Sequence, residues 1–250
     1  MKDYNKFWKI MKASHSRHPS VRFRNHLIVG AVRRILGQFK GISILDVGCG
    51  NADLLKELKS RLCLDRGEVT LSWYDISQYQ IEKNKLQGLP FDFRVVDFNG
   101  RVDVSSKFEI IICSEVIEHL ENWKPSLQNM ADMNKPGGYL ILTTQSGKRL
   151  KSDLALGHLQ HFELHHLTDH LKAMNYDIIR AERCGFPFYD LQKVANSIFF
   201  PMAERVAHTE INLLNSILFG CTYFLFRISL RSKRLGPQIF ILAHKLSNGG

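Results

Sequence analysis

The chain has 250 residues, of which 44% are hydrophobic, and its formal net charge at pH 7 is +10. This length and composition suit one large domain, or one domain with an insertion, and they supply enough apolar residues for a sizeable core. The five cysteines are scattered and include no C-x-x-C pair, so neither a disulfide framework nor a zinc cage is expected. A reducing, cytoplasmic location fits this cysteine usage, and the first residues contain no apolar stretch typical of a signal peptide.

The first forty residues are strongly basic and predicted to be helical over 4–38, with a break near His18-Pro19. They contain ten Lys or Arg residues and one acidic residue, so they carry nearly all of the positive excess. Such a segment suits contact with RNA, an anionic membrane surface or a phosphorylated substrate. A solvated helical face is the plainer interpretation.

From residue 41 to about residue 185, short apolar strands alternate with helical patterns, which predicts a largely parallel sheet with helices on both faces. The predicted strands are 42–47, 69–74, 91–96, 109–114, 139–144, 177–182 and 238–243. The predicted helices between them include 53–60, 78–86, 123–133 and 164–174. Pro136-Gly137-Gly138 predicts a turn before the fifth strand.

Residues 186–236 interrupt this alternation and are predicted to be an apolar helical insertion, with the final strand and tail in 237–250. Within the insertion, residues 211–230 contain one charged residue, Arg227. The length suits a membrane-spanning helix, but five Asn, Ser and Thr residues weaken that interpretation. A lid over a substrate pocket or a helix lying on a membrane surface is favoured.

The strand over 42–47 leads directly into Gly48 and Gly50 and then into a helical pattern. Glycines at a strand-to-helix turn let the backbone approach a ligand, and this edge of a doubly wound sheet binds nucleotide-like cofactors. Asp53 stands where a dinucleotide fingerprint has its third glycine, which disfavours NAD.

Acidic residues follow three further predicted strands. Asp75 ends the second strand, where a carboxylate can accept hydrogen bonds from two ribose hydroxyls. Asp97 and Phe98 end the third, where they suit an adenine amino group and ring, and Glu115 follows the fourth. Each acid alone is typical of a loop or a helix cap, but their order along the sheet predicts an adenosine site.

Residues 41 to about 182 resemble class I S-adenosylmethionine-dependent methyltransferases of the ubiquinone-biosynthesis-like, type 11 group. The resemblance rests on six segments that occur in the family's order: 44–52, Tyr74-Asp-Ile-Ser, Val96-Asp-Phe, 108–120, 135–144 and Gly157-His-Leu-Gln-His-Phe-Glu-Leu-His-His-Leu. In the first segment, Ala52 stands in place of the usual last glycine. It implies a seven-stranded Rossmann-like sheet, the last strand antiparallel, with a SAM-binding core over 41–185 and the insertion between strands six and seven. Residues 1–40 and the insertion lie outside the resemblance and are expected to select the substrate.

The same resemblance implies a cofactor site. Asp46, Gly48, Cys49 and Gly50 would hold the methionine part of S-adenosylmethionine. The ribose would lie against Asp75 and Ile76, the adenine against Asp97 and Phe98, and the sulfonium end beside Ser114 and Glu115.

Methyl transfer to an oxygen requires alignment of the acceptor with the S–CH₃ bond and a base that removes its proton. His119, His158 and His161 are the candidate bases, because histidine titrates near neutral pH. We rank His119 and His161 above His158, although a structural role is the plainer interpretation of each.

An alternative role for part of this set is metal binding. Glu115, Glu118 and His119 would share one face if a helix began at Glu115, and with His161 they would bind Mg²⁺ or another divalent ion. This arrangement resembles small-RNA 3′-terminal 2′-O-methyltransferases. Base methylation is disfavoured, because Cys113-Ser114-Glu115 replaces the Pro-Pro-aromatic loop that grips an exocyclic amine.

The sequence therefore predicts a methyltransferase that acts on an oxygen, less readily on nitrogen or carbon, of a small or lipid-linked acceptor. Peripheral membrane contact is an option, and the oligomeric state is not predicted. The alternatives are a metal-dependent RNA 2′-O-methyltransferase and a non-catalytic binding partner that retains the fold.

Overall fold

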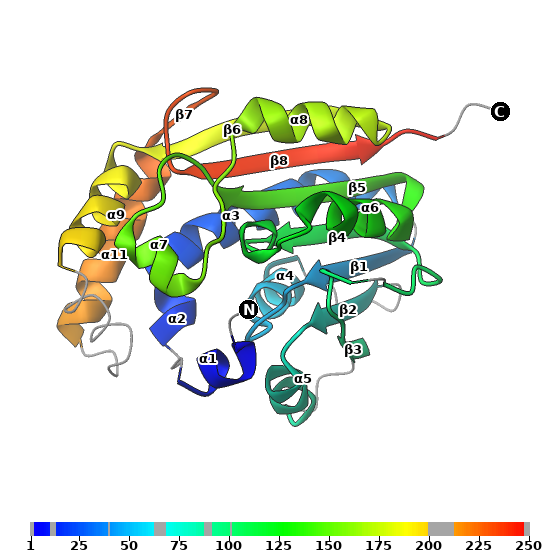
Figure 1. The fold of residues 1–250 in the computed structure, drawn as a ribbon, viewed down its shortest axis with the longest axis horizontal. Helices are drawn as coiled ribbons and strands as arrows, with labels where there is room; N and C mark the ends of the chain where they lie inside the picture. Colours follow the sequence, from blue (N-terminus) through cyan, green and yellow to red (C-terminus); the bar gives the residue numbers. More distant parts are fainter. Residues whose placement is uncertain are drawn as a thin grey trace.

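The computed structural model describes residues 3–10, 14–39, 41–62, 69–87, 92–100, 102–199 and 213–247. Within these residues, eight strands form one sheet in the order β3-β2-β1-β4-β5-β8-β6-β7, and helices cover both of its faces (Figure 1). The strands are β1 (Ile42–Val47), β2 (Val69–Asp75), β3 (Asp92–Val95), β4 (Phe108–Ser114), β5 (Asn134–Gln145), β6 (Tyr176–Phe186), β7 (Leu230–Ser232) and β8 (Gln238–Lys245).

The doubly wound fold and its reversed last strand are confirmed. β1 to β5 pair in parallel, and β8 runs antiparallel between β5 and β6. The described sheet has eight strands rather than the predicted seven, because the three-residue β7 pairs with the end of β6. A run of three residues is too short to show a strand pattern, and β6 itself continues four residues beyond its predicted end at Glu182.

The described helices include all four that were predicted between the strands, with boundaries shifted by a few residues, and one over Lys151–Leu156 that was not predicted. They are α1 (Tyr4–Ile10), α2 (Ser14–Arg17), α3 (Pro19–Ile35), α4 (Asp53–Leu62), α5 (Gln78–Lys85), α6 (Trp123–Met133), α7 (Lys151–Leu156), α8 (Leu164–Ala173), α9 (Phe188–Ile198) and α11 (Leu213–Ile228), with short 3₁₀ turns η1 (Leu36–Gln38) and η2 (Ile117–His119). The predicted break near Pro19 is present, because proline begins α3 where no backbone N–H is needed.

The start of β5 differs from the prediction, and the start of β3 is described only in part. Pro136-Gly137-Gly138 does not form a turn before β5 but lies inside it, where the pairing with β4 shifts register. Gly137 has φ +73°, so the turn signal marks an irregularity that glycine permits within the strand. Phe91, predicted to begin the third strand, lies outside the described residues.

Alternation along the strands divides the core into two layers. Ile44 and Ile110 face one layer, which contains the buried residues of α3 and α4, whereas Leu45 and Ile111 face the other, which contains those of α6 and α8. α3 is therefore a core helix rather than a solvated face, and only part of the basic N-terminal segment, including Arg33 and Arg34, is exposed.

The insertion region carries α9 and α11 beside one another at the end of the sheet where β6 and β7 pair (Figure 1). Residues 200–212, which fall within the predicted insertion, lie outside the described residues, as does Cys63. α11 has 16 residues, and among the described helices none has both the length and the apolar character needed to cross a bilayer.

Candidate active site

A cavity of about 860 Å³ opens at the carboxyl ends of β1, β2 and β4, next to the loop after β3. The end of a parallel sheet is where ligands bind in doubly wound folds. All ten predicted cofactor residues line this cavity: Asp46, Gly48, Cys49, Gly50, Asp75, Ile76, Asp97, Phe98, Ser114 and Glu115. Their individual roles toward the cofactor stay predictions.

The glycine turn after β1 requires left-handed backbone. Gly48 and Gly50 have φ +70° and +48°, and a Cβ atom at Gly48 would lie 2.4 Å from a methyl carbon of Val116. Ala52 also lies in the left-handed region, at φ 60°, a conformation that glycine adopts at lower cost than alanine. The buried Asn84 of α5 fixes the turn by donating a hydrogen bond to the Gly50 carbonyl at 2.9 Å.

Asp75 connects this turn to the end of β2. Its carboxylate accepts hydrogen bonds from the N–H groups of Gly50 at 2.9 Å and Ser77 at 2.8 Å. Because each carboxylate oxygen has two lone pairs, both oxygens keep acceptor capacity for a ligand hydroxyl. Asp75 thus shapes the turn and lines the cavity at once.

Asp97 and Phe98 occupy the loop after β3. Asp97 accepts a hydrogen bond from the Asn99 N–H at 2.9 Å, and Phe98 is buried in the layer that contains α6. The Ser126 hydroxyl of α6 lies 2.7 Å from the Phe98 carbonyl and 2.7 Å from the Asn122 carbonyl, so its single proton can serve either oxygen.

Glu115 does not begin a helix, so the expected helical face of Glu115, Glu118 and His119 is wrong. Glu115 has φ 57°, and the segment that follows forms only the short η2. The two carboxylates have different partners, Gln145 for Glu115 and Thr144 for Glu118.

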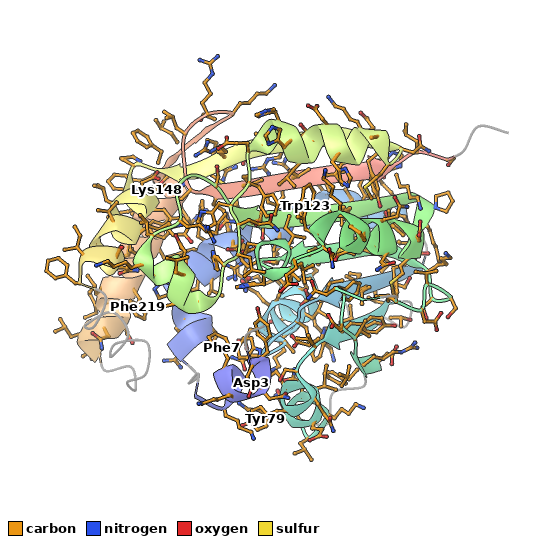
Figure 2. All side chains as sticks on the ribbon, in the orientation of Figure 1. Asp3, Phe7, Tyr79, Trp123, Lys148 and Phe219 are labelled. Carbon is orange, nitrogen blue, oxygen red and sulfur yellow. The ribbon has the colours of Figure 1, made fainter. Side chains whose placement is uncertain are left out.

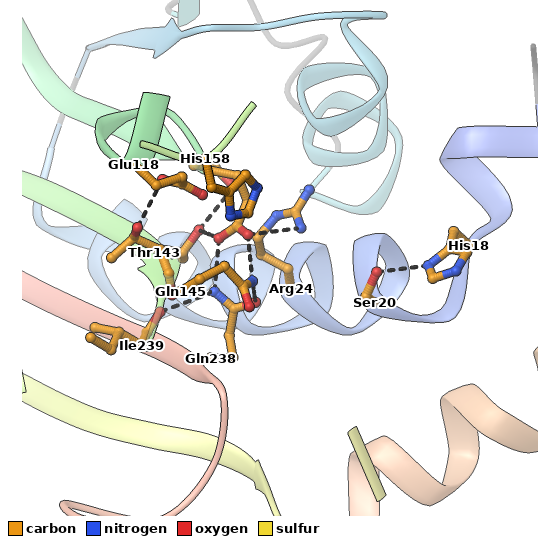
Figure 3. Close-up of polar contacts among 12 residues, drawn as sticks. His18, Ser20, Arg24, Glu118, Thr143, Gln145, His158, Gln238 and Ile239 are labelled. Atoms are coloured by element: carbon orange, nitrogen blue, oxygen red, sulfur yellow. Dashed lines mark hydrogen bonds and ion pairs between the residues drawn. The ribbon is translucent and has the colours of Figure 1, made fainter. Parts of the chain in front are cut away.

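The Glu115 carboxylate at the end of β4 interacts with Arg24, Gln145 and Gln238, which are labelled in Figure 3. It accepts hydrogen bonds from the amides of Gln145 at 2.6 Å and Gln238 at 2.8 Å, and it lies 3.9 Å from the Arg24 guanidinium of α3. Burial acts to raise the pKa of Glu115, but Arg24 and the two amides outweigh it and lower the pKa below its usual range. Glu115 is therefore an ionised acceptor with fixed geometry.

Glu118 is fully buried behind the cavity wall. Its Oε2 accepts a hydrogen bond from Thr144 at 2.8 Å, whereas its Oε1 has no hydrogen-bond partner among the described residues. Burial, and then the charge of Glu115, raises the pKa of Glu118 well above its usual value. A buried carboxyl oxygen without a partner is costly, and a cation or donor would relieve it.

His119 and His158 line the cavity, whereas His161 lies behind His158. His161 Nδ1 lies 3.0 Å from the Gly147 carbonyl and must donate to it, so in a neutral ring its Nε2 is an acceptor. His158 Nδ1 lies 3.0 Å from that Nε2 and donates to it. The Nε2 of His158 is then left as a lone-pair acceptor.

His119 has the same tautomer as His158. Its Nδ1 lies 3.1 Å from the Gly157 carbonyl, so the donor role falls to Nδ1 and Nε2 is an acceptor. The rings of His119 and His158 are edge-to-face, with centroids 4.8 Å apart. Burial, with His119 beside it, lowers the pKa of His158 to about 3, so His158 is neutral at physiological pH.

Potential metal ligands gather at this wall in a combination that differs from the predicted one. Glu118, His119 and His158 offer ligand atoms within 4.8 Å of one another, and so do Asp153, His158 and His161. Among the described residues, the predicted set of Glu115, Glu118, His119 and His161 does not form such a group. Whether any of these groups binds metal stays a prediction.

Several cavity residues were not found from the sequence. α1 contributes Tyr4, Phe7 and Trp8, and a Cβ atom at Gly50 would lie 2.6 Å from the Trp8 ring. Figure 2 shows Asp3 and Phe7 near Tyr79 of α5, and Asn5 accepts a hydrogen bond from the Tyr79 N–H at 3.2 Å. No motif marks such a contact, because it joins residues more than seventy positions apart.

Lys193 of α9 was missed as well. Its ammonium lies 3.2 Å from Asp153 of α7 and donates to Gln145 at 3.0 Å. It therefore connects the insertion to the end of β5 and to the network around Glu115.

A family model described as a methyltransferase domain matches residues 20–181, well over half of the chain. The chain therefore belongs to this family, and its fold is that of the class I methyltransferases, whose cofactor is S-adenosylmethionine. The match begins at residue 20, so α3, which we expected to lie outside the family region, belongs to it.

Among curated proteins, the chain is similar to ubiquinone biosynthesis O-methyltransferases. It is 34% identical over 110 residues to that of Chelativorans sp. (strain BNC1), covering 42% of this chain and 41% of the relative. It is 29% identical over 139 residues to that of Parvibaculum lavamentivorans, covering 56% and 54%. The matches thus span about half the length of these relatives or less.

Solved structures share the fold at low sequence identity. The N-methyltransferase NodS from Bradyrhizobium japonicum WM9, in complex with S-adenosylhomocysteine, has a TM-score of 0.55 and 13% identity, covering 92% of this chain and 89% of that one. The [4+2]-cyclase SpnF has a TM-score of 0.58 and 16% identity, covering 88% and 80%. Because a cyclase shares the fold, the fold alone does not determine the reaction.

The affinity for S-adenosylmethionine should rise as pH increases from about 6 to about 8. Burial, and then Asp75, raises the pKa of Asp46 to about 8, so this carboxyl is largely protonated at neutral pH. A cationic cofactor favours the ionised form, so binding should release a proton and gain at most about tenfold in affinity per pH unit. Calorimetry in two buffers of different ionisation enthalpy measures the number of protons that are released when the cofactor binds.

Asp46→Asn should remove this pH dependence, whereas Asp103→Asn, which changes a solvent-exposed acid outside the cavity, should keep it. A pH-independent affinity in the unmodified protein would contradict the role of Asp46.

Removing residues 1–13 should weaken S-adenosylhomocysteine binding by about tenfold while the core stays folded. α1 lies over the glycine turn through Trp8, whereas the buried residues of α3 begin only at Pro19. Calorimetry measures the affinity, and thermal unfolding monitors the core. Trp8→Ala should show part of the same loss, and unchanged affinity in both variants would make α1 irrelevant to the cofactor.

Proposed function

We propose that the protein transfers the methyl group of S-adenosylmethionine to an oxygen atom of a small or lipid-linked acceptor, with His158 or His119 as the base. The observation that carries this proposal is the pair of imidazoles on the cavity wall. Each is held by Nδ1, which leaves Nε2 as an acceptor. The similarity to ubiquinone biosynthesis O-methyltransferases supports an oxygen acceptor.

The sulfonium is an activated methyl donor, so the main task of the protein is alignment, which contributes roughly 7–11 kcal/mol to such reactions. Ser114 lies at the end of β4, where its hydroxyl hydrogen-bonds with Thr143 at 3.0 Å. Beside it, ionised Glu115 adds negative charge next to the sulfonium position. We assign to these two residues the sulfonium end of the cofactor.

Proton removal from a hydroxyl needs a neutral imidazole at the start of the reaction. The low pKa of His158 keeps the ring neutral across the neutral range, but it also makes Nε2 a weaker base than an ordinary imidazole. Burial lowers this pKa, whereas the negative charges of Glu115 and Asp153 raise it. The two carboxylates therefore stabilise the imidazolium as it forms. His161, which receives the Nδ1–H of His158, orients the ring.

An apolar acceptor, or one joined to a lipid, fits the rim of the cavity. Leu156 and Leu159 line it and are 43% and 46% exposed. Apolar side chains at the mouth of a pocket favour an acceptor that brings apolar surface with it.

The proposal is tested by incubating the protein with methyl-labelled S-adenosylmethionine and hydroxyl-bearing acceptors, including a lipid extract, and by following label into solvent-extractable product. We expect label in a methyl ether. Label only in N-methyl or C-methyl products would overturn the oxygen assignment. Absence of cofactor binding in calorimetry would favour a non-catalytic binding module instead.

A divalent cation is a second candidate for activating the acceptor. It is favoured by Glu118, whose Oε1 has no hydrogen-bond partner among the described residues and whose carboxylate offers a ligand atom close to His119 and His158. Two imidazoles and a carboxylate suit Zn²⁺, Mn²⁺ or Fe²⁺ better than Mg²⁺. Elemental analysis of the purified protein and activity after chelation distinguish the cation from a histidine base. The RNA acceptor predicted alongside a metal stays a prediction.

A further inference from the structure

α11 presents an apolar face to solvent along its whole length. Leu214, Ile217, Leu218, Phe224 and Ile228 recur at helical spacing and are between 56% and 72% exposed. The opposite side of the helix holds it to the core through Phe226, which is fully buried against α3 and α9. The exposed face is therefore not needed for packing among the described residues.

α9 continues this surface. Leu191, Val194 and Ile198 are between 47% and 67% exposed, while Gln192 and Lys193 of the same helix line the cavity. α9 packs against both α11 and α7, so its exposed apolar residues belong to a helix that lies between α11 and the helix that carries Leu156. Figure 2 shows Phe219 of α11 at this side of the molecule. We call the exposed apolar residues of α9 and α11 the α9–α11 surface.

Positive charge lies at one end of the α9–α11 surface. Arg227, Arg231, Lys233 and Arg234 are exposed, and α11 contains no acidic residue. Apolar side chains beside cations are the combination that binds anionic lipid surfaces.

We propose that the α9–α11 surface docks onto an anionic lipid bilayer, with its apolar residues among the acyl chains and its cations at the headgroups. This docking goes beyond the proposed methyl transfer and does not depend on it. It would place the rim formed by Leu156 and Leu159 near the lipid, so that an acceptor could pass from the bilayer to the cavity.

Flotation of the full chain with phosphatidylcholine vesicles, with and without phosphatidylglycerol, tests the proposal. We expect binding to the anionic vesicles, little binding to the neutral ones, and weaker binding at high salt. A double variant, Ile217→Asn with Phe224→Ser, should lower vesicle affinity by at least about tenfold. Its S-adenosylhomocysteine affinity in calorimetry should be unchanged, because neither residue lines the cavity.

Leu86→Ser is the matched control, because Leu86 is 88% exposed at the end of α5, outside the α9–α11 surface. It should bind vesicles like the unmodified protein. The proposal is overturned if the unmodified protein does not float with anionic vesicles, or if the double variant floats as well as the control. It is also overturned if sedimentation shows a dimer that the double variant dissociates, which would assign the surface to a second copy. Failure of cofactor binding would instead contradict the proposed function alone.

Discussion

Asp75→Ala should lower the affinity for S-adenosylhomocysteine by about 10²–10⁴-fold, because two hydrogen bonds to a charged acceptor contribute roughly 1.5–3 kcal/mol each. The carboxylate lines the cavity and already fixes the N–H groups of Gly50 and Ser77. The loss therefore combines missing ribose contacts with a looser glycine turn. Calorimetry gives the affinity, and circular dichroism shows whether the sheet is retained.

Asp75→Asn separates the two contributions, since the amide keeps one acceptor oxygen but replaces the other with a donor. Its affinity should lie between those of the alanine variant and the unmodified protein. Asp103→Asn is the control, because Asp103 also accepts a backbone N–H, from Ser105, but lies outside the cavity. Affinity unchanged in Asp75→Ala would remove the ribose assignment.

His158→Ala should lower turnover by about 10²–10⁴-fold, the usual contribution of a general base, while S-adenosylhomocysteine affinity stays close to that of the unmodified protein. The ring lines the cavity, and its tautomer is set through His161 by the Gly147 carbonyl. His119→Ala distinguishes the two candidate bases, and the larger loss identifies the one that takes the proton. Rates of methyl transfer from the labelled cofactor provide the measurement.

His161→Ala should lower turnover less than His158→Ala and should change the pH profile, because His158 would lose the acceptor that fixes its Nδ1–H. His166→Ala, on the exposed side of α8, is the control and should behave like the unmodified protein. Full activity in both His158→Ala and His119→Ala would exclude these imidazoles as the base, and it would also exclude a divalent cation held by Glu118, His119 and His158.

The gathering of the predicted cofactor residues around one cavity followed closely from the sequence. Strand patterns placed Asp46, Asp75, Asp97 and Glu115 at the ends of four strands, and parallel pairing brings such ends to one edge. The inference needed only local periodicity and chain order. It failed for the backbone at Glu115, whose left-handed conformation has no signature in a non-glycine residue.

The side of the cavity that carries the histidines was predicted less well. The sequence ranked His161 above His158, whereas the structure places His158 on the cavity wall and His161 behind it. Both residues lie in one loop, three positions apart, and its path depends on contacts such as the Leu159 N–H with the Glu118 carbonyl at 2.8 Å. Spacing along an irregular loop does not show which side chain faces a cavity.

By itself, the sequence determined the doubly wound sheet and the order of polar residues along its edge, because these depend on residue periodicity and on glycines at turns. The reversed last strand was expected only from the family resemblance. The tertiary structure alone decided that α1 covers the glycine turn, that α3 brings Arg24 to Glu115, and that Lys193 joins the insertion to the site. Those contacts form between residues distant in the chain. They are fixed by packing of the whole fold, so the local sequence around each residue does not predict them.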